Sequence, residues 1–375
     1  MDVVGKPDAD QAAERLAAWW EGELVDRAVV QVTAPRAGLS RADLAPLNSP
    51  VGLPQADMLA WFTDLQQVLP RMELRVASTF WGGEAIPVAF PVSTSLVAIL
   101  AAYLGCPYAV TSGTGWADPI VTDWANRPRF AFDPHNEWWL RSRRLLEAAA
   151  EQAAGRYFIG LPDLNGPSQI LALLRDPQQL ALDLIDDPIP LPVALDEVNR
   201  AWLRYYQASV GAVHQYVGDY FFWMGIWSDR PAVDLQNDFS CLISTRMFDD
   251  LFLPGLEEQT RWVERTIYHL DGPGAIRHLD ALLSLPRLTG IQWVPGAGAA
   301  PMSHWIRLLR RIQAGGKRLV LACEPQEVEV LLAELEPEGL LLSTSCPSEE
   351  GARDLLAHVP GWMQRRQWAA APPLL

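Results

Sequence analysis

Three residues that could bind a metal follow two short strand-like runs in the last third of the sequence. His269 and Asp271 close the run 266–270, and Cys346 follows the run 339–345. If both runs are parallel strands of one barrel, their carboxyl ends meet at one rim and bring the three side chains together. An imidazole, a carboxylate and a thiolate around one point can bind zinc.

Four successive strand–helix units are predicted around these residues. The expected strands are residues 266–270, 290–294, 318–322 and 339–344, and the expected helices are residues 275–284, 305–312, 326–335 and 349–359. Short apolar runs without alternation are typical of strands buried on both faces, and helices between them indicate right-handed parallel crossovers. Polar, glycine or proline residues follow each strand, where such barrels carry their chemistry.

Upstream, the pattern is weaker but continues. The expected strands are residues 28–33, 86–90, 156–161 and 220–223, and the expected helices are residues 10–22, 136–154, 167–175 and 195–217. We predict an α/β protein: a (β/α)8 TIM barrel over residues 81–368, with an N-terminal helical extension over residues 1–80 packed on it as part of one domain. A doubly wound open sheet is the alternative, but no complete glycine-rich phosphate turn is present.

Composition limits the partners. The chain has 375 residues, of which 49% are hydrophobic and 20% charged, and its 30 basic and 45 acidic residues give a net charge of -15. This excess of acid argues against binding to nucleic acid or to an anionic membrane surface. The four cysteines are scattered, and neither a signal peptide nor a membrane span is visible, so we expect a cytoplasmic protein.

Three acidic residues are candidates for acid–base catalysis. Asp163 and Asp238 are expected to face the barrel mouth from one wall, and Glu324 follows the predicted strand 318–322. Turn chemistry explains Asp163 equally well. In the same way, Asp271 could cap the following helix.

The sequence contains sixteen tryptophans, which could build an aromatic pocket wall. Trp81, Trp223, Gln292 and Trp293 are the candidates for substrate binding. Gln292 and Trp293 precede a proline at a strand end, whereas packing in the core is the simpler explanation for Trp81 and Trp223.

Several blocks, taken in order, resemble the uroporphyrinogen decarboxylase superfamily. They are residues 22–27 (Gly-Glu-Leu-Val-Asp-Arg), 162–167 (Pro-Asp-Leu-Asn-Gly-Pro), 237–240 (Asn-Asp-Phe-Ser) with the Ile-Ser pair at 243–244 and residues 248–254, and 268–272 (Tyr-His-Leu-Asp-Gly). The resemblance covers residues 12–360 and implies a (β/α)8 barrel with an open mouth. The arginine-rich motif of the true decarboxylases is not found, so the chain is more similar to the methyltransferase branch.

That branch transfers methyl groups between a corrinoid protein and a thiol or methyl donor, using zinc bound by a histidine, a cysteine two residues later and a distant cysteine. By resemblance, His269 matches the histidine and Cys346 the distant cysteine, while Asp271 replaces the first cysteine. Aspartate also ligates zinc, but it makes the site less thiophilic. The resemblance thus implies a metal-assisted methyltransferase or demethylase that acts with a corrinoid carrier protein on a small methylated substrate; a homodimer is compatible with it.

Two alternatives remain open. A metal-free lyase or hydrolase could use Asp163, Asp238, Asp271 and Glu324 as acid and base, and two such carboxyl groups among tryptophans would suit a sugar. The chain could also be a ligand-binding barrel that has lost its zinc site. The fold alone does not choose among these functions.

Overall fold

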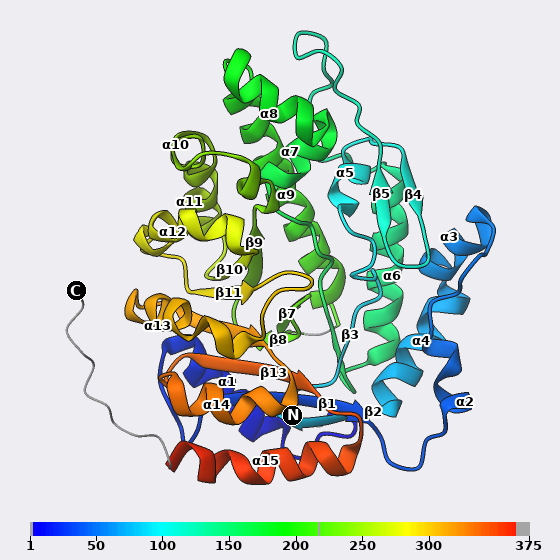
Figure 1. The fold of residues 1–375 in the computed structure, drawn as a ribbon. Helices are drawn as coiled ribbons and strands as arrows, with labels where there is room; N and C mark the ends of the chain where they lie inside the picture. Colours follow the sequence, from blue (N-terminus) through cyan, green and yellow to red (C-terminus); the bar gives the residue numbers. More distant parts are fainter. Residues whose placement is uncertain (1–2, 217, 365–375) are drawn as a thin grey trace.

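The four strands predicted in the last third of the chain are neighbours in one parallel sheet of the computed structural model, which describes residues 3–216 and 218–364 (Figure 1). They are β10 (Arg265–Asp271), β11 (Gly290–Val294), β12 (Arg318–Ala322) and β13 (Leu340–Ser345). The elements between and after them are η4 (Pro273–His278), α12 (Leu279–Ser284), η5 (Met302–Trp305), α13 (Ile306–Ala314), η6 (Pro325–Glu327), α14 (Val328–Glu334) and α15 (Glu349–Gln364). Each strand is predominantly buried, as its apolar run predicts.

The sheet has seven strands in the order β2-β1-β13-β12-β11-β10-β9. β1 (Val29–Pro35) pairs in parallel with β13, and β2 (Thr79–Gly83) pairs with β1 in the antiparallel direction. At the other edge, β9 (Ala232–Gln236) pairs in parallel with β10. The prediction of an α/β protein with a mostly parallel sheet is therefore confirmed.

The first 80 residues contribute a strand to the sheet in addition to helices. Their helical elements are α1 (Ala9–Glu21), α2 (Arg41–Leu44), η1 (Ala45–Leu47), α3 (Gln55–Thr63) and α4 (Leu65–Ser78). Between α1 and α2, however, β1 forms an interior strand of the sheet, because its run of valines is buried on both faces. β1 is the strand expected at residues 28–33, within the helical extension predicted for residues 1–80; residues 1–2 and 365–368 of the predicted ranges lie outside the described residues.

The remaining strands form pairs. β3 (Val88–Ala89) is parallel to β6 (Phe158–Ile159), whereas β4 (Tyr108–Val110) with β5 (Gly115–Ala117) and β7 (Tyr220–Phe222) with β8 (Ile226–Ser228) are antiparallel. One backbone hydrogen bond connects two of these pairs: the Leu161 N–H, just after β6, donates to the Phe221 carbonyl of β7 at 2.9 Å. The Glu84 N–H, just after β2, donates to the Val30 carbonyl of β1 at 3.1 Å and extends the pairing of β1 with β2. The hydrogen-bonded strands of the described residues do not form one closed sheet.

Helices dominate the middle of the chain. They are α5 (Ile99–Tyr103), α6 (Glu137–Ala153), α7 (Pro167–Arg175), α8 (Pro177–Asp186), α9 (Leu191–His214), η2 (Asp238–Leu242), α10 (Thr245–Met247), the π-helical turn η3 (Phe248–Phe252) and α11 (Leu253–Trp262). The helix predicted over residues 195–217 is α9, and its predicted last residue, Val217, lies outside the described residues. None of the helices in the described part of the chain has the length and apolarity that a membrane crossing requires.

Candidate functional site

The register of three neighbouring strands brings polar side chains together. His269 of β10 lies opposite Gln236 of β9 and opposite Gln292 of β11. Because side chains alternate along a strand, Asp234 shares a face with Gln236, and Asp271 shares one with His269. The carboxyl ends of β9, β10 and β11 therefore carry one polar cluster.

Three of these residues could hold a metal ion. Asp238, directly after β9, contributes one ligand atom, as do His269 and Asp271, and the three atoms lie within 4.8 Å of one another. All three side chains are half-buried. One carboxylate oxygen of Asp238, Oδ1, is buried without a hydrogen-bond partner among the described residues. A buried oxygen left in this way is the kind of atom that a bound cation would satisfy.

The ring of His269 is fixed by two neighbours. Its Nδ1 lies 2.6 Å from Oε1 of Gln292, which can only accept a hydrogen bond, so Nδ1 carries the proton. In the neutral ring, Nε2 is then free to bind a metal, and the Gln292 contact holds the tautomer in place. The indole of Trp223 meets the imidazole edge to face, with ring centroids 5.3 Å apart.

A second pair of carboxylates lies behind this group. Nε2 of Gln236 donates to Asp163 at 2.9 Å and to Asp234 at 2.8 Å, so that one amide bridges both side chains. The backbone N–H of Asn165 also donates to Asp163, at 2.9 Å. Asp163 lies in the turn after β6, so the side-chain amide of Gln236 links this turn to β9.

Burial sets the protonation of these acids. It raises the pKa of Asp163 well above 3.8, and the charge of Asp234 adds to this effect. Burial likewise raises the pKa of Asp234 and of Asp238, the latter against the opposing influence of His269. Within residues 3–216 and 218–364, none of these acids forms an ion pair with lysine or arginine. Their negative charge is thus left for a proton or a bound cation.

Backbone geometry fixes the turn that carries Asp163. Asn165 adopts a left-handed conformation with φ of 55°, and its side-chain oxygen accepts a hydrogen bond of 2.7 Å from the Ala98 N–H. At the next position, a Cβ on Gly166 would lie 1.5 Å from the carbonyl oxygen of Gln236. Only glycine allows the turn to approach β9 this closely.

The structure does not bring Cys346 into the group of residues that could hold a metal ion. It follows β13, where its N–H donates to the Thr33 carbonyl at 2.8 Å, and its side chain is buried. Burial also raises the pKa of the thiol, which disfavours the thiolate that binds metals. The position at a strand end is as the sequence indicates, but the group within reach of His269 contains Asp238 instead.

Three other candidates lie in different settings. Glu324 is exposed and caps η6, in a reciprocal capping box with Glu327. The Trp81 indole, on β2, donates to the Val76 carbonyl at 3.2 Å. Trp293 is fully buried, so it packs in the core and does not line an open pocket.

Asp234 and Gln236 are the members of the cluster that our sequence reading missed. The strand β9 that carries them was not predicted, because polar residues interrupt its apolar pattern. A usable signal was present: Asp234, Gln236 and Asp238 occur at every second position, and this spacing places strand residues on one face.

Comparison with solved structures finds the same fold in a methyltransferase from Methanosarcina mazei. The two chains superpose with a TM-score of 0.60 at 15% sequence identity, over 94% of this chain and 98% of the other. No protein-family model matches the sequence, and a search of curated proteins finds no match either. The likeness concerns the fold and covers nearly the whole of both chains.

Proposed function

We propose that this protein is a metal-dependent enzyme of the methyltransferase-like branch of the uroporphyrinogen decarboxylase superfamily. The observation that carries the proposal is the group of Asp238, His269 and Asp271, whose ligand atoms lie within 4.8 Å at the carboxyl ends of β9 and β10. Active sites of (β/α)8 barrels lie at this end of the strands. The similarity in fold to a methyltransferase supports the same assignment.

The proposed fold is a (β/α)8 barrel whose sheet is interrupted. The parallel pair β3–β6 would fill the gap between β1 and β9, which gives eight barrel strands: β1, β3, β6 and β9 to β13. The hydrogen bond from the Gln236 side chain of β9 to Asp163, in the turn after β6, crosses one side of this gap and supports closure.

The residues present fit a divalent metal ion of intermediate or hard character. Two carboxylates and one imidazole suit zinc, manganese or iron(II), and the unpartnered Oδ1 of Asp238 leaves one coordinating oxygen unsatisfied. The expected trio with Cys346 would suit a softer, thiol-activating zinc. When bound, the metal would act as a Lewis acid that polarises the heteroatom carrying the methyl group.

The surrounding residues have separate tasks in this proposal. Gln292 holds the proton on Nδ1 of His269, and Trp223 fixes the plane of the ring. Asp163, whose pKa is raised by burial, would supply a proton at the edge of the site.

The bond between the methyl carbon and its heteroatom breaks, and the heteroatom keeps the electron pair and takes the proton of Asp163. The methyl group passes to a nucleophilic acceptor, which we propose to be the reduced corrinoid of a carrier protein. A methylated oxygen, nitrogen or sulfur compound of small size is the proposed substrate.

Metal analysis of the purified chain tests this proposal. After dialysis against zinc, manganese or iron(II), we expect about one ion per chain for one of these metals, and loss of it in His269→Ala and in Asp238→Asn. Asp57→Asn, an exposed aspartate outside the site, is the matched control. Wild-type protein that retains no metal would refute the metal site.

Methyl transfer is tested separately, with reduced cobalamin as the acceptor and methylated thiols, amines and methoxy compounds as donors. Formation of methylcobalamin, followed by its absorbance, should depend on the bound metal. A metal-loaded protein that transfers no methyl group from any donor class would contradict the methyltransferase assignment while leaving the metal site intact.

A second candidate function is a metal-free lyase or hydrolase. It is favoured by one observation: Asp163 and Asp234 share the amide of Gln236, and both have raised pKa values. Paired acids in such surroundings suit general acid–base catalysis. Activity that survives complete removal of metal by a chelator would support this function over the first.

A further inference from the structure

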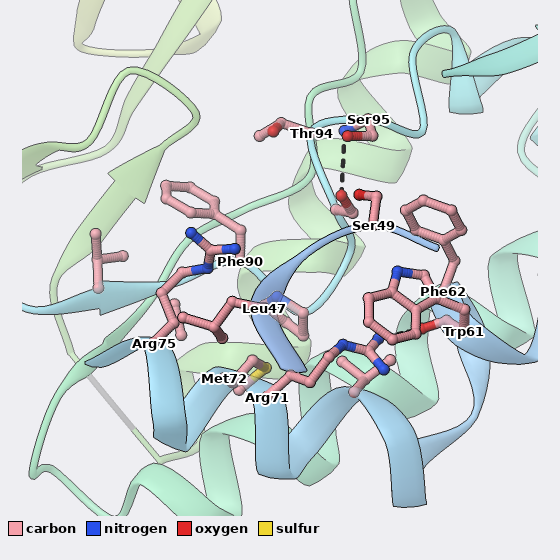
Figure 2. A pocket seen from close by; sticks show the side chains of 15 residues that line it. Leu47, Ser49, Trp61, Phe62, Arg71, Met72, Arg75, Phe90, Thr94 and Ser95 are labelled. Atoms are coloured by element: carbon pink, nitrogen blue, oxygen red, sulfur yellow. Dashed lines mark hydrogen bonds between the residues drawn. The ribbon is translucent and has the colours of Figure 1, made fainter. Parts of the chain in front are cut away.

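A pocket of about 330 Å³ opens between α3, α4 and the segment that follows β3 (Figure 2). It contains none of the residues of the acidic cluster. Its polar lining consists of two guanidinium groups and four hydroxyl groups: Arg71, Arg75, Ser49, Ser93, Thr94 and Ser95. Apolar side chains, among them Phe62 and Phe90, complete the wall.

The two arginines come from one face of α4. They are four residues apart, so they lie one helical turn from each other, and Figure 2 shows both side chains rising from α4 toward the pocket. Like charges at this spacing repel each other. Neither forms an ion pair within the described residues, although the chain has 45 acidic residues and a net charge of -15. Glu73, which lies between them in the sequence, pairs with Arg156 instead.

Arg71 is held in place by Trp61. Its guanidinium lies 3.4 Å from the centre of the indole ring and donates to the Trp61 backbone carbonyl. Burial, together with the charge of Arg75, lowers the pKa of Arg71 to about 10. Because a guanidinium carries five N–H donors in its plane, Arg71 can stack on the Trp61 ring and still have donors that can contact a ligand.

Hydroxyl groups face the arginines across the pocket. Ser93, Thr94 and Ser95 come from the segment after β3, and the Ser95 N–H donates to the Ser93 hydroxyl at 3.2 Å (Figure 2). The same segment continues to Ala98, which binds the side chain of Asn165 beside Asp163. The pocket is therefore structurally connected to the candidate site.

We propose that this pocket binds the phosphate group of a small molecule. Two guanidinium groups and several hydroxyl donors can contact more oxygens than a carboxylate has, and arginine pairs with phosphate through parallel hydrogen bonds. A phosphate would also remove the repulsion between the two arginines. The proposal does not depend on a metal in the acidic cluster.

Titration calorimetry of the full chain with inorganic phosphate, at constant ionic strength maintained with chloride, tests the proposal. We expect saturable binding of one phosphate per chain, at least about tenfold weaker in Arg75→Gln and in Arg71→Gln, because each loses a charged hydrogen bond. Arg307→Gln, an exposed arginine of α13 outside the pocket, should bind as the wild type does.

Further variants distinguish a loss of phosphate binding from a loss of folding. Arg71→Lys keeps the charge, so it should retain more affinity than Arg71→Gln if the chain folds, which circular dichroism checks. Arg75 is exposed and its loss should not disturb folding. Absence of saturable binding, equal weakening in Arg307→Gln, or acetate binding as tight as that of phosphate would overturn the proposal.

Discussion

Two buried carboxylates, Glu84 and Asp234, show opposite ways of placing a negative charge inside this protein. Glu84 is fully buried, but it forms ion pairs of 3.0 Å with Arg15 and 2.6 Å with Arg27 and accepts the Val30 N–H at 2.8 Å. Asp234 is almost equally buried, yet no lysine or arginine of the described part of the chain forms an ion pair with it.

The difference separates a buried charge that cations compensate from one that they do not. A buried charge is stable when cations and hydrogen bonds compensate it, as they do for Glu84. Two more acids, Asp163 and Asp238, interact electrostatically with Asp234, so three carboxyl groups lie near one another. Proteins accept such an arrangement mainly where the charge is used, by binding a cation or by exchanging a proton.

Neutralising the two carboxylates should give the largest effect and the clearest contrast. Glu84→Gln leaves Arg15 and Arg27 without their shared partner, and we expect it to lower the free energy of unfolding by about 3–5 kcal/mol. Asp234→Asn removes a charge that no cation compensates, so it should raise this free energy at pH 8. Denaturant unfolding measures both, with the exposed Glu14→Gln as control. Equal destabilisation by Glu84→Gln and Asp234→Asn would contradict the difference between the two carboxylates.

Removing the hydrogen-bond partner of His269 tests whether this histidine binds a metal ion. Gln292→Leu deletes the oxygen that fixes the imidazole tautomer while keeping a side chain of similar size. Loss of such a partner weakens metal binding by roughly 10- to 100-fold. Competition with a chromophoric chelator would measure this affinity, and the exposed Gln326→Leu is the matched variant. An unchanged affinity would mean that His269 is not a ligand.

The acidic cluster should also make stability depend on pH. Since the pKa values of Asp163 and Asp234 are raised in the folded protein, the folded state binds more protons than the unfolded state above pH 3.8. The metal-free chain should therefore lose stability as the pH rises from 3.8 through the raised pKa values. Melting temperatures from pH 4 upward would follow this loss, and Asp163→Asn should flatten the curve. Stability that rises over the same interval without metal would contradict the assigned pKa directions.

The smallest effect is expected at Cys346. Because the thiol is buried and outside the metal-binding group, Cys346→Ser should change the affinity for metal less than about twofold and destabilise the fold by about 1 kcal/mol. Metal analysis of this variant beside His269→Ala sharpens the contrast between a neighbouring thiol and a ligand. Complete loss of metal in Cys346→Ser would restore the ligand set that the sequence suggests.

The strands from β10 onward could be predicted because each is a short apolar run bounded by turn residues. Strand β9 could not, since Asp234 and Gln236 point into the site and remove the apolar signal that marks a buried strand. The same polar residues form the hydrogen-bonded cluster with Asp163. Sequence therefore indicated His269, Asp271, Asp238 and Asp163, but not Asp234 and Gln236.

The choice between Asp238 and Cys346 lay beyond sequence reasoning for a different reason. Both residues follow strands that end at the same edge, and order along the chain does not tell which side chain turns toward His269. This depends on the register of neighbouring strands and on the path of the chain just after them. Asp238 begins η2 directly after β9, the strand adjacent to β10.

Gly166 has a consequence for anyone who wishes to redesign this protein. Since a methyl group there would overlap the Gln236 carbonyl, even alanine would push the Asp163 turn away from β9. A library of variants aimed at a new substrate should therefore keep this position constant and vary the side chains around Trp223. Without Gly166, the effect of every other substitution near the site would be combined with the effect of a displaced Asp163 turn.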